Sequence, residues 1–149
     1  ALESIRKQTY PDVETVVIED GLEISRQMIC TEYSDLQLRY ISTGKRVGRA
    51  KAGNLGMKVA QGKYLNFLDD DDVLYPEHIE ILLQTLQSAE EKAVYSVAEE
   101  AAAIYRKRKR TFYDVRKKVR FREPFNRMYL LHTNYLPIQS VMFEKSLFY

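Results

Sequence analysis

The most informative run in the sequence is Lys63-Tyr64-Leu65-Asn66-Phe67-Leu68-Asp69-Asp70-Asp71-Asp72. A short apolar and aromatic run ends in four consecutive aspartates, which is typical of a buried strand whose carboxyl end opens at the surface. Apolar residues then recur at helical spacing over 76–88, and Pro76 is expected at the first helical position, where a missing N–H costs nothing. Because open α/β sheets bind ligands beyond the carboxyl ends of their strands, we expect a binding site here.

The acidic tetrad, defined as Asp69 to Asp72, has two interpretations. Four neighbouring carboxylates repel one another and raise one another's pKa unless a cation neutralises them. Hard oxygen ligands of this kind suit Mg²⁺ or Mn²⁺. The alternative is a solvated acidic loop that favours the N-terminus of the next helix. The tetrad alone leaves both interpretations open.

On both sides of the tetrad, the hydrophobic pattern predicts alternating strands and helices. Up to residue 88 it predicts helices at 1–9, 24–33, 49–60 and 76–88 and strands at 13–18, 36–41 and just before the tetrad. This alternation predicts an α/β fold with a mostly parallel sheet flanked by helices. Beyond residue 91 the pattern predicts a strand at 93–98, a hairpin or loop formed by 101–105 and 111–115, a helix from Pro124 to Leu131 and a strand at 138–143.

Composition points to a soluble globular chain. Its 149 residues are 45% hydrophobic and 30% charged, which is enough for one domain with a core. The net charge is only +2, but residues 66–100 are nearly all acidic among their charges and 106–127 nearly all basic, which favours an anionic ligand or surface. Cys30, the single cysteine, is expected to be a small buried residue. No apolar run approaches the roughly 20 residues that span a bilayer, and we expect a cytoplasmic location.

Three features fall at or just beyond predicted strand ends, where one ligand could contact them all. The first is Asp20, which could accept a hydrogen bond from a base or sugar or could simply form a turn. The second is the start of the helix at 49–60, where Arg49 and Lys51 could meet phosphate through charge and free N–H groups or could form a solvated face. The third is the tetrad. Within the same helix, Gly53 and Gly56 are expected to permit close packing.

The order and spacing of these features resemble a known family. Gln8-Thr9-Tyr10-Pro11-Asp12-Val13-Glu14 and Val16-Val17-Ile18-Glu19-Asp20-Gly21 look like the opening of a family 2 glycosyltransferase, a nucleotide-diphospho-sugar transferase of the GT-A fold. The second block, from Gly48 through Asn54 and Gly62 to the tetrad and Pro76, resembles the family block that ends in the DxD motif. Lys51-Ala52-Gly53-Asn54-Leu55 is similar to a variant in processive members such as cellulose synthases, although many members carry Arg where this chain has Gly53. The resemblance spans roughly residues 2–90 and is weaker beyond.

The resemblance implies roles for individual residues. Asp20 matches the aspartate that reads the nucleotide base, commonly uracil, and Lys51 would approach the base or phosphate. Asp69 and Asp71 match the DxD pair, with Asp71 holding a divalent Mg²⁺ or Mn²⁺ on the diphosphate, and Asp70 lies where ribose contact is expected. The implied activity is inverting transfer from a UDP-sugar to a saccharide or lipid-linked acceptor, as in polysaccharide biosynthesis.

Two departures from the family pattern qualify this expectation. The family's first strand, which lies centrally in its sheet, has no counterpart here, and the family's catalytic base, an acidic residue near the domain end, is not matched by Glu123 or Glu144. We therefore expect a single partial GT-A domain, with 1–92 as the nucleotide-sugar-binding part and 93–149 as the start of the acceptor-side part. We expect such a fragment to be inactive, or nearly so, by itself.

Two other readings of the sequence remain. Asp69-Asp70-Asp71-Asp72-Val73 also fits the nucleophile motif of haloacid-dehalogenase-like phosphatases, although that motif usually lies near the start of its domain. Alternatively, the basic residues of 106–122 could make a non-enzymatic module that binds nucleic acid or anionic lipid, or could form a solvated hairpin. For the transferase we expect no nucleic acid partner. Peripheral contact with an anionic membrane, at its inner face, is compatible with the transferase reading.

Overall fold

The computed structural model describes residues 1–106 and 111–148, with side chains described outside 102–119. The predicted basic turn at 107–110 lies outside the described residues. The helices are α1 (Leu2–Arg6), α2 (Arg26–Glu32), α3 (Arg49–Val59), α4 (His78–Ser88) and α5 (Arg127–His132), with two short 3₁₀ turns, Ile138–Ser140 and Lys145–Phe148. The strands are β1 (Thr15–Glu19), β2 (Leu38–Ser42), β3 (Tyr64–Asn66), β4 (Ala93–Tyr95), β5 (Ala98–Arg106), β6 (Thr111–Phe121) and β7 (Val141–Glu144).

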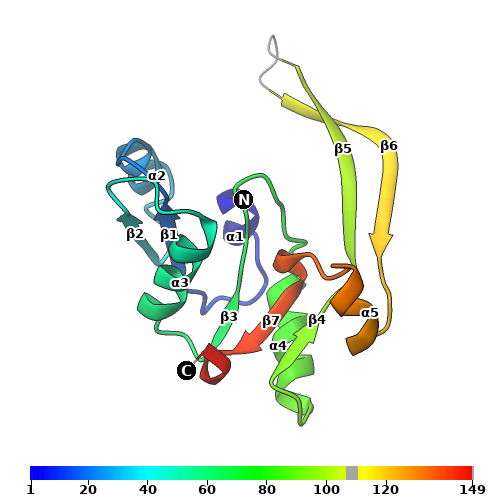
Figure 1. The fold of residues 1–149 in the computed structure, drawn as a ribbon. Coiled ribbons are helices and arrows are strands. Elements are labelled where there is room, and N and C mark those ends of the chain that lie inside the picture. Colours follow the sequence, from blue (N-terminus) through cyan, green and yellow to red (C-terminus); the bar gives the residue numbers. More distant parts are fainter. Residues whose placement is uncertain (107–110, 149) are drawn as a thin grey trace.

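The strands form three separate hydrogen-bonded groups (Figure 1). β1 and β2 are parallel, with a register that runs from Thr15 opposite Leu38 to Glu19 opposite Ser42. β7 lies between β3 and β4 and is antiparallel to both. β5 and β6 form an antiparallel hairpin that projects away from the rest of the chain, with α5 near its base. The prediction of an incomplete α/β fold with a parallel sheet and flanking helices is confirmed, and the parallel pairing is that of β1 with β2.

A hydrophobic core lies between α4 and the sheet formed by β3, β7 and β4. Leu82, Leu83 and Leu86 are buried on one face of this helix, and they pack with Met142 of β7, which is only 4% exposed. The apolar spacing predicted this face of the helix, because residues three and four apart lie on the same side. Burial of these side chains fixes α4 against β4 and β7, and therefore fixes the point at which the chain leaves the tetrad.

Two glycines of α3 face its neighbours. A Cβ added at Gly56 would lie 3.4 Å from Cγ1 of Ile18 on β1, and one added at Gly53 would lie 3.5 Å from the Phe67 ring. Both are ordinary van der Waals separations, so a larger side chain such as alanine would fit, and the expectation that glycine is what permits the close packing is wrong. The helix contacts both β1 and the segment that follows β3.

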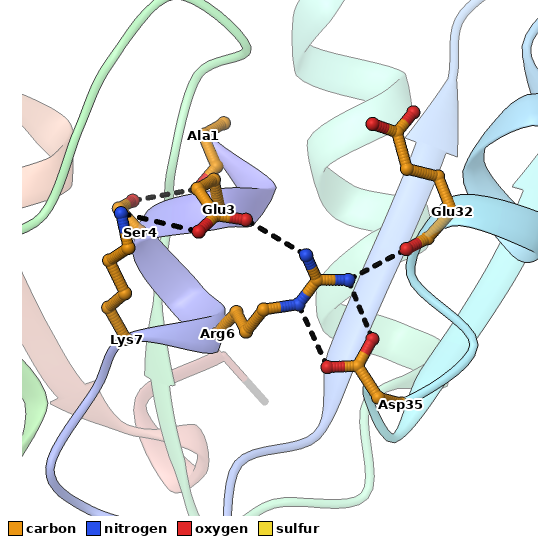
Figure 2. Close-up of polar contacts among 7 residues, drawn as sticks. All are labelled: Ala1, Glu3, Ser4, Arg6, Lys7, Glu32 and Asp35. Carbon is orange, nitrogen blue, oxygen red and sulfur yellow. Dashed lines mark hydrogen bonds and ion pairs between the residues drawn. The ribbon is translucent and has the colours of Figure 1, made fainter.

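α1 connects the segment between α2 and β2 with the segment that leads from the tetrad into α4. Its Arg6 guanidinium donates to both carboxylate oxygens of Asp35, at 2.7 and 2.8 Å, and to the Glu32 carbonyl at 2.7 Å (Figure 2). The same guanidinium bonds Glu3 at 2.9 Å and lies 4.7 Å from the centre of the Tyr33 ring. These contacts attach α1 to the segment that joins α2 to β2.

The opposite side of α1 holds the segment that leads from the tetrad into α4. The Ser4 hydroxyl accepts from the Leu74 amide at 3.1 Å. The Gln8 side chain donates to the Tyr75 carbonyl at 2.8 Å and accepts from the Ile79 amide at 3.0 Å. Because these are bonds to backbone, they fix the course of residues 74–79 whatever side chains that segment carries.

Two expectations from the sequence are wrong in detail. Cys30 is exposed rather than buried, because α2 packs only loosely: of its seven described residues none is buried, and Met28 is 60% exposed. Pro76 lies before α4, which begins at His78, because the Pro76 carbonyl accepts from the Thr9 amide at 2.9 Å and belongs to the turn that α1 holds.

Candidate functional site

The tetrad lies in the turn that follows β3. Asp69, Asp71 and Asp72 each offer a carboxylate oxygen, and these three oxygens lie within 4.8 Å of one another. Asp69 and Asp72 are half-buried, whereas Asp71 is exposed. Three hard oxygen donors at this separation fit an oxygen-preferring divalent cation such as Mg²⁺ or Mn²⁺.

Asp72 is the member of this group that sequence reasoning missed. The DxD resemblance singled out Asp69 and Asp71, whereas the turn brings Asp72 into the same cluster. Burial raises the pKa of the Asp72 carboxyl, and the negative charges of Asp71, Asp69 and Asp70 raise it further. A bound cation would relieve this repulsion. Asp70 is exposed and lies outside the group of three converging oxygens.

Asp20 is held at the end of β1 by hydrogen bonds from a neighbouring turn. The Val47 amide donates to its Oδ1 at 2.7 Å, and the Gly48 amide donates to its Oδ2 at 2.9 Å. The Thr43 hydroxyl lies 3.3 Å from Oδ1. The Val47 amide is the main reason that the pKa of Asp20 lies below its ordinary value, with smaller contributions from Gly48, Thr43 and Arg46 against partial burial. Asp20 therefore stays ionised, and it fixes the turn that leads into α3.

The same hydrogen bonds fix the approach to α3. The amides of Val47 and Gly48, which precede α3, both donate to Asp20. Gly48 takes φ 95° and ψ 151°, a conformation essentially restricted to glycine, and this brings its amide toward Asp20. Lys51 is exposed in the first turn of α3.

Glu19 plays a matching part on the other side of β1, and sequence reasoning did not single it out. Its carboxylate accepts from the Ile24 and Ser25 amides, at 3.1 and 3.3 Å, and from the Tyr40 hydroxyl of β2. Two consecutive carboxylates thus hold the two turns that flank the end of β1. The only sequence signal for this role of Glu19 is that a Glu-Asp pair stands at a strand end and is followed by glycine.

Arg49 connects the start of α3 to the tetrad. Its Nη2 lies 3.3 Å from Oδ2 of Asp69. The neighbouring Gly48 amide bonds to Asp20, so two consecutive residues contact both acidic positions, Gly48 through its backbone and Arg49 through its side chain. The structure therefore brings together the three features at predicted strand ends: Asp20, the start of α3 and the tetrad.

Comparison with known proteins gives one family. The sequence model described as glycosyl transferase family 2 matches residues 1–148. Curated relatives include glycosyltransferase GlyG of Streptococcus pneumoniae, 33% identical over 95 residues. An uncharacterized glycosyltransferase of Rickettsia felis is 42% identical over 90 residues, and the putative glycosyltransferase EpsH of Bacillus subtilis is 31% identical over 85 residues.

These alignments cover only part of each relative. They include 62, 58 and 56% of this chain, in the order given above, but only 32, 14 and 25% of the relatives themselves. The chain therefore spans a minor part of the length of these proteins.

Proposed function

The chain belongs to glycosyl transferase family 2, and from this premise we propose that it binds a nucleotide-diphosphate sugar, with UDP-sugar as the donor, for transfer of the sugar to an acceptor. One observation carries the proposal. The carboxylates of Asp69, Asp71 and Asp72 converge beside a helix start that Asp20 holds in place. The family match favours glycosyl transfer over the phosphatase alternative, which needs Asp69 as a nucleophile.

Each residue of the site has a proposed part. Asp69, Asp71 and Asp72 would hold Mg²⁺ or Mn²⁺, which supplies Lewis-acid stabilisation of the charge that develops on the departing diphosphate. Asp20 and Lys51 would bind the nucleotide, and Asp70, which is exposed beside the converging oxygens, would contact the ribose. The carboxylates position charge and need not transfer protons. An inverting reaction also needs a base, and neither Glu123 nor Glu144 is assigned that role.

We extend the proposal to the two parts of the chain. Residues 1–92 contain β1 to α4 and all the donor-site residues, and we assign them to donor binding. Residues 93–149 would begin the acceptor side, with a saccharide or lipid-linked acceptor. Polysaccharide biosynthesis is the process that such a pair of substrates would serve.

Calorimetry of UDP binding, with and without Mn²⁺, tests the donor site. We expect Mn²⁺ to strengthen UDP binding, and we expect Asp71→Asn and Asp72→Asn each to remove most of that gain. Asp12→Asn is the matched control, because Asp12 is an exposed aspartate remote in sequence from the tetrad. Equal UDP affinity with and without Mn²⁺ in the unmodified protein would contradict the proposed role of the tetrad.

A second proposal concerns location: peripheral contact with an anionic membrane. Phe125, Met128 and Leu131, in and just before α5, are 64, 67 and 74% exposed; the exposed Arg127 lies among them in sequence, and the exposed Arg122 precedes them. Interfacial segments combine large apolar side chains with cations in this way. No helix among the described residues has both the length and the apolar character needed to cross a bilayer.

Vesicle sedimentation tests this location. We expect binding to vesicles that contain phosphatidylserine and expect it to weaken with salt, since the attraction is partly electrostatic. The double variant Met128→Ser/Leu131→Ser should lose binding. Leu22→Ser/Ile24→Ser is the control, because these apolar residues are also exposed, at 68 and 81%, but lie far from α5 in the sequence. Equal losses of vesicle binding in the two double variants would contradict the proposal.

A further inference from the structure

Arg49 is a cation that contacts the tetrad. Its guanidinium reaches Asp69 at 3.3 Å, while 88% of the Arg49 side chain is exposed. Asp69 is also one of the three carboxylates whose oxygens converge. An ion pair that is this exposed is worth little by itself, because solvent screens it and the long side chain loses freedom. The pair can therefore be exchanged at small cost.

The backbone of Arg49, in contrast, is fixed. The Gly48 amide bonds Asp20 at 2.9 Å, and Ala52, one turn into α3, is buried. Only the side chain of Arg49 is free to move, and it pivots about a point held beside the carboxylates. A guanidinium on such an anchor can reach different partners within one side-chain length.

We propose that Arg49 is an exchangeable counter-ion of the donor site. Without a metal ion its guanidinium neutralises part of the charge on Asp69. When a divalent cation is held by the three carboxylates, that cation takes over the charge on Asp69, and the released guanidinium binds the diphosphate of the nucleotide. Arginine suits this role because its planar fork matches the geometry of both carboxylate and phosphate oxygens and can bind either through paired hydrogen bonds. The inference rests on the proposed function, since it needs a metal ion and a diphosphate at this site.

This role predicts opposite changes in two affinities when Arg49 is removed. Arg49→Gln removes a competitor for Asp69, so Mn²⁺ alone should bind about two- to fivefold more tightly, the range expected for losing an exposed ion pair. The same variant loses a charge-assisted contact to diphosphate. UDP at saturating Mn²⁺ should therefore bind more weakly, by about fivefold or more. Arg49→Lys keeps the charge without the fork, so it should leave Mn²⁺ affinity near that of the unmodified chain and still weaken UDP.

The experiment measures Mn²⁺ affinity by electron paramagnetic resonance and UDP affinity by calorimetry, on the full chain. Arg26→Gln is the control, because Arg26 also forms an exposed ion pair, with Glu23 at 3.1 Å, on α2. Tighter Mn²⁺ and weaker UDP in Arg49→Gln, with neither change in Arg26→Gln, supports the proposal. Parallel weakening of both ligands, or no change in either, overturns it while the donor site stands. Failure of the unmodified chain to bind Mn²⁺ overturns the proposed metal site and, with it, this role of Arg49.

Discussion

Gly48→Asn tests whether the turn before α3 depends on backbone conformation. Gly48 takes φ 95° and ψ 151°, and a Cβ added there would meet no atom within 4 Å. The substitution therefore introduces no clash, and its effect comes from the conformation alone, which costs a non-glycine residue about 1–3 kcal/mol. For a chain of this size, a loss of about 2 kcal/mol lowers the melting temperature by roughly 4–8 °C.

The same substitution at a second glycine gives the control. Gly44 has φ 71°, again with no atom within 4 Å of an added Cβ, and asparagine tolerates this left-handed conformation. We therefore expect Gly44→Asn to melt much closer to the unmodified protein, as followed by circular dichroism. Hydrogen exchange adds a local measurement: the Val47 amide, which donates to Asp20, should lose protection in Gly48→Asn only. If both variants melt alike and the Val47 amide stays protected, the turn does not depend on Gly48 and our reasoning fails.

Three further predictions concern stability. Leu82→Ala should lower the free energy of unfolding by about 3 kcal/mol, because Leu82 is 2% exposed, whereas Ile81→Ala, at a 57% exposed position, should change it by less than about 0.5 kcal/mol; urea titration separates the two. Burial lowers the pKa of His78 below its ordinary value of 6.5, with a hydrogen bond to the Gln139 backbone acting in opposition, so below pH 6.5 the unfolded chain takes up a proton more readily than the folded chain does. The free energy of unfolding should therefore decrease as the pH is lowered from the unfolded pKa toward the lower folded pKa. Between pH 7.5 and 5.5, His78→Gln should lose less of this free energy than the unmodified protein; an equal loss would contradict this. Asn66→Leu should cost about 1–3 kcal/mol in the same titration, since the Asn66 amide donates to the Gln139 and Val141 carbonyls at 2.9 and 2.7 Å; a neutral result would show that water replaces it.

Much of the fold was predictable because periodicity reports which face of an element is buried. The helix expected at 76–88 is α4, whose apolar face buries Leu82, Leu83 and Leu86, and the helix expected at 49–60 is α3, with Ala52 buried. The apolar residues of the helix expected at 24–33 followed the same pattern, yet Ile24, just before α2, is 81% exposed and Met28, within α2, is 60% exposed. Periodicity describes a face that can be buried; it does not say whether another element lies against it.

Strand pairing and the polar contacts were less predictable. The strand expected at 138–143 begins as a 3₁₀ turn, and β7 then pairs antiparallel between β3 and β4, a long-range arrangement that no local pattern encodes. Residue types pointed to Asp20 and the tetrad, but not to the partners of Asp20, which are backbone amides carrying no sequence signature. Asp72 joined the cluster for the same reason: the course of a turn decides which of four adjacent carboxylates converge.

The position of α1 has a consequence for how the protein comes apart. A helix of five residues is far too short to persist alone, so it exists only while both of its neighbours are in place. Its Arg6 bonds Asp35 of the segment between α2 and β2. Its Ser4 and the adjoining Gln8 bond the backbone of the segment that leads into α4. If the β1–β2 sheet or the segment leading into α4 unfolds, α1 loses its contacts there and no longer supports the other. The two separately paired sheets should therefore unfold as a single cooperative unit.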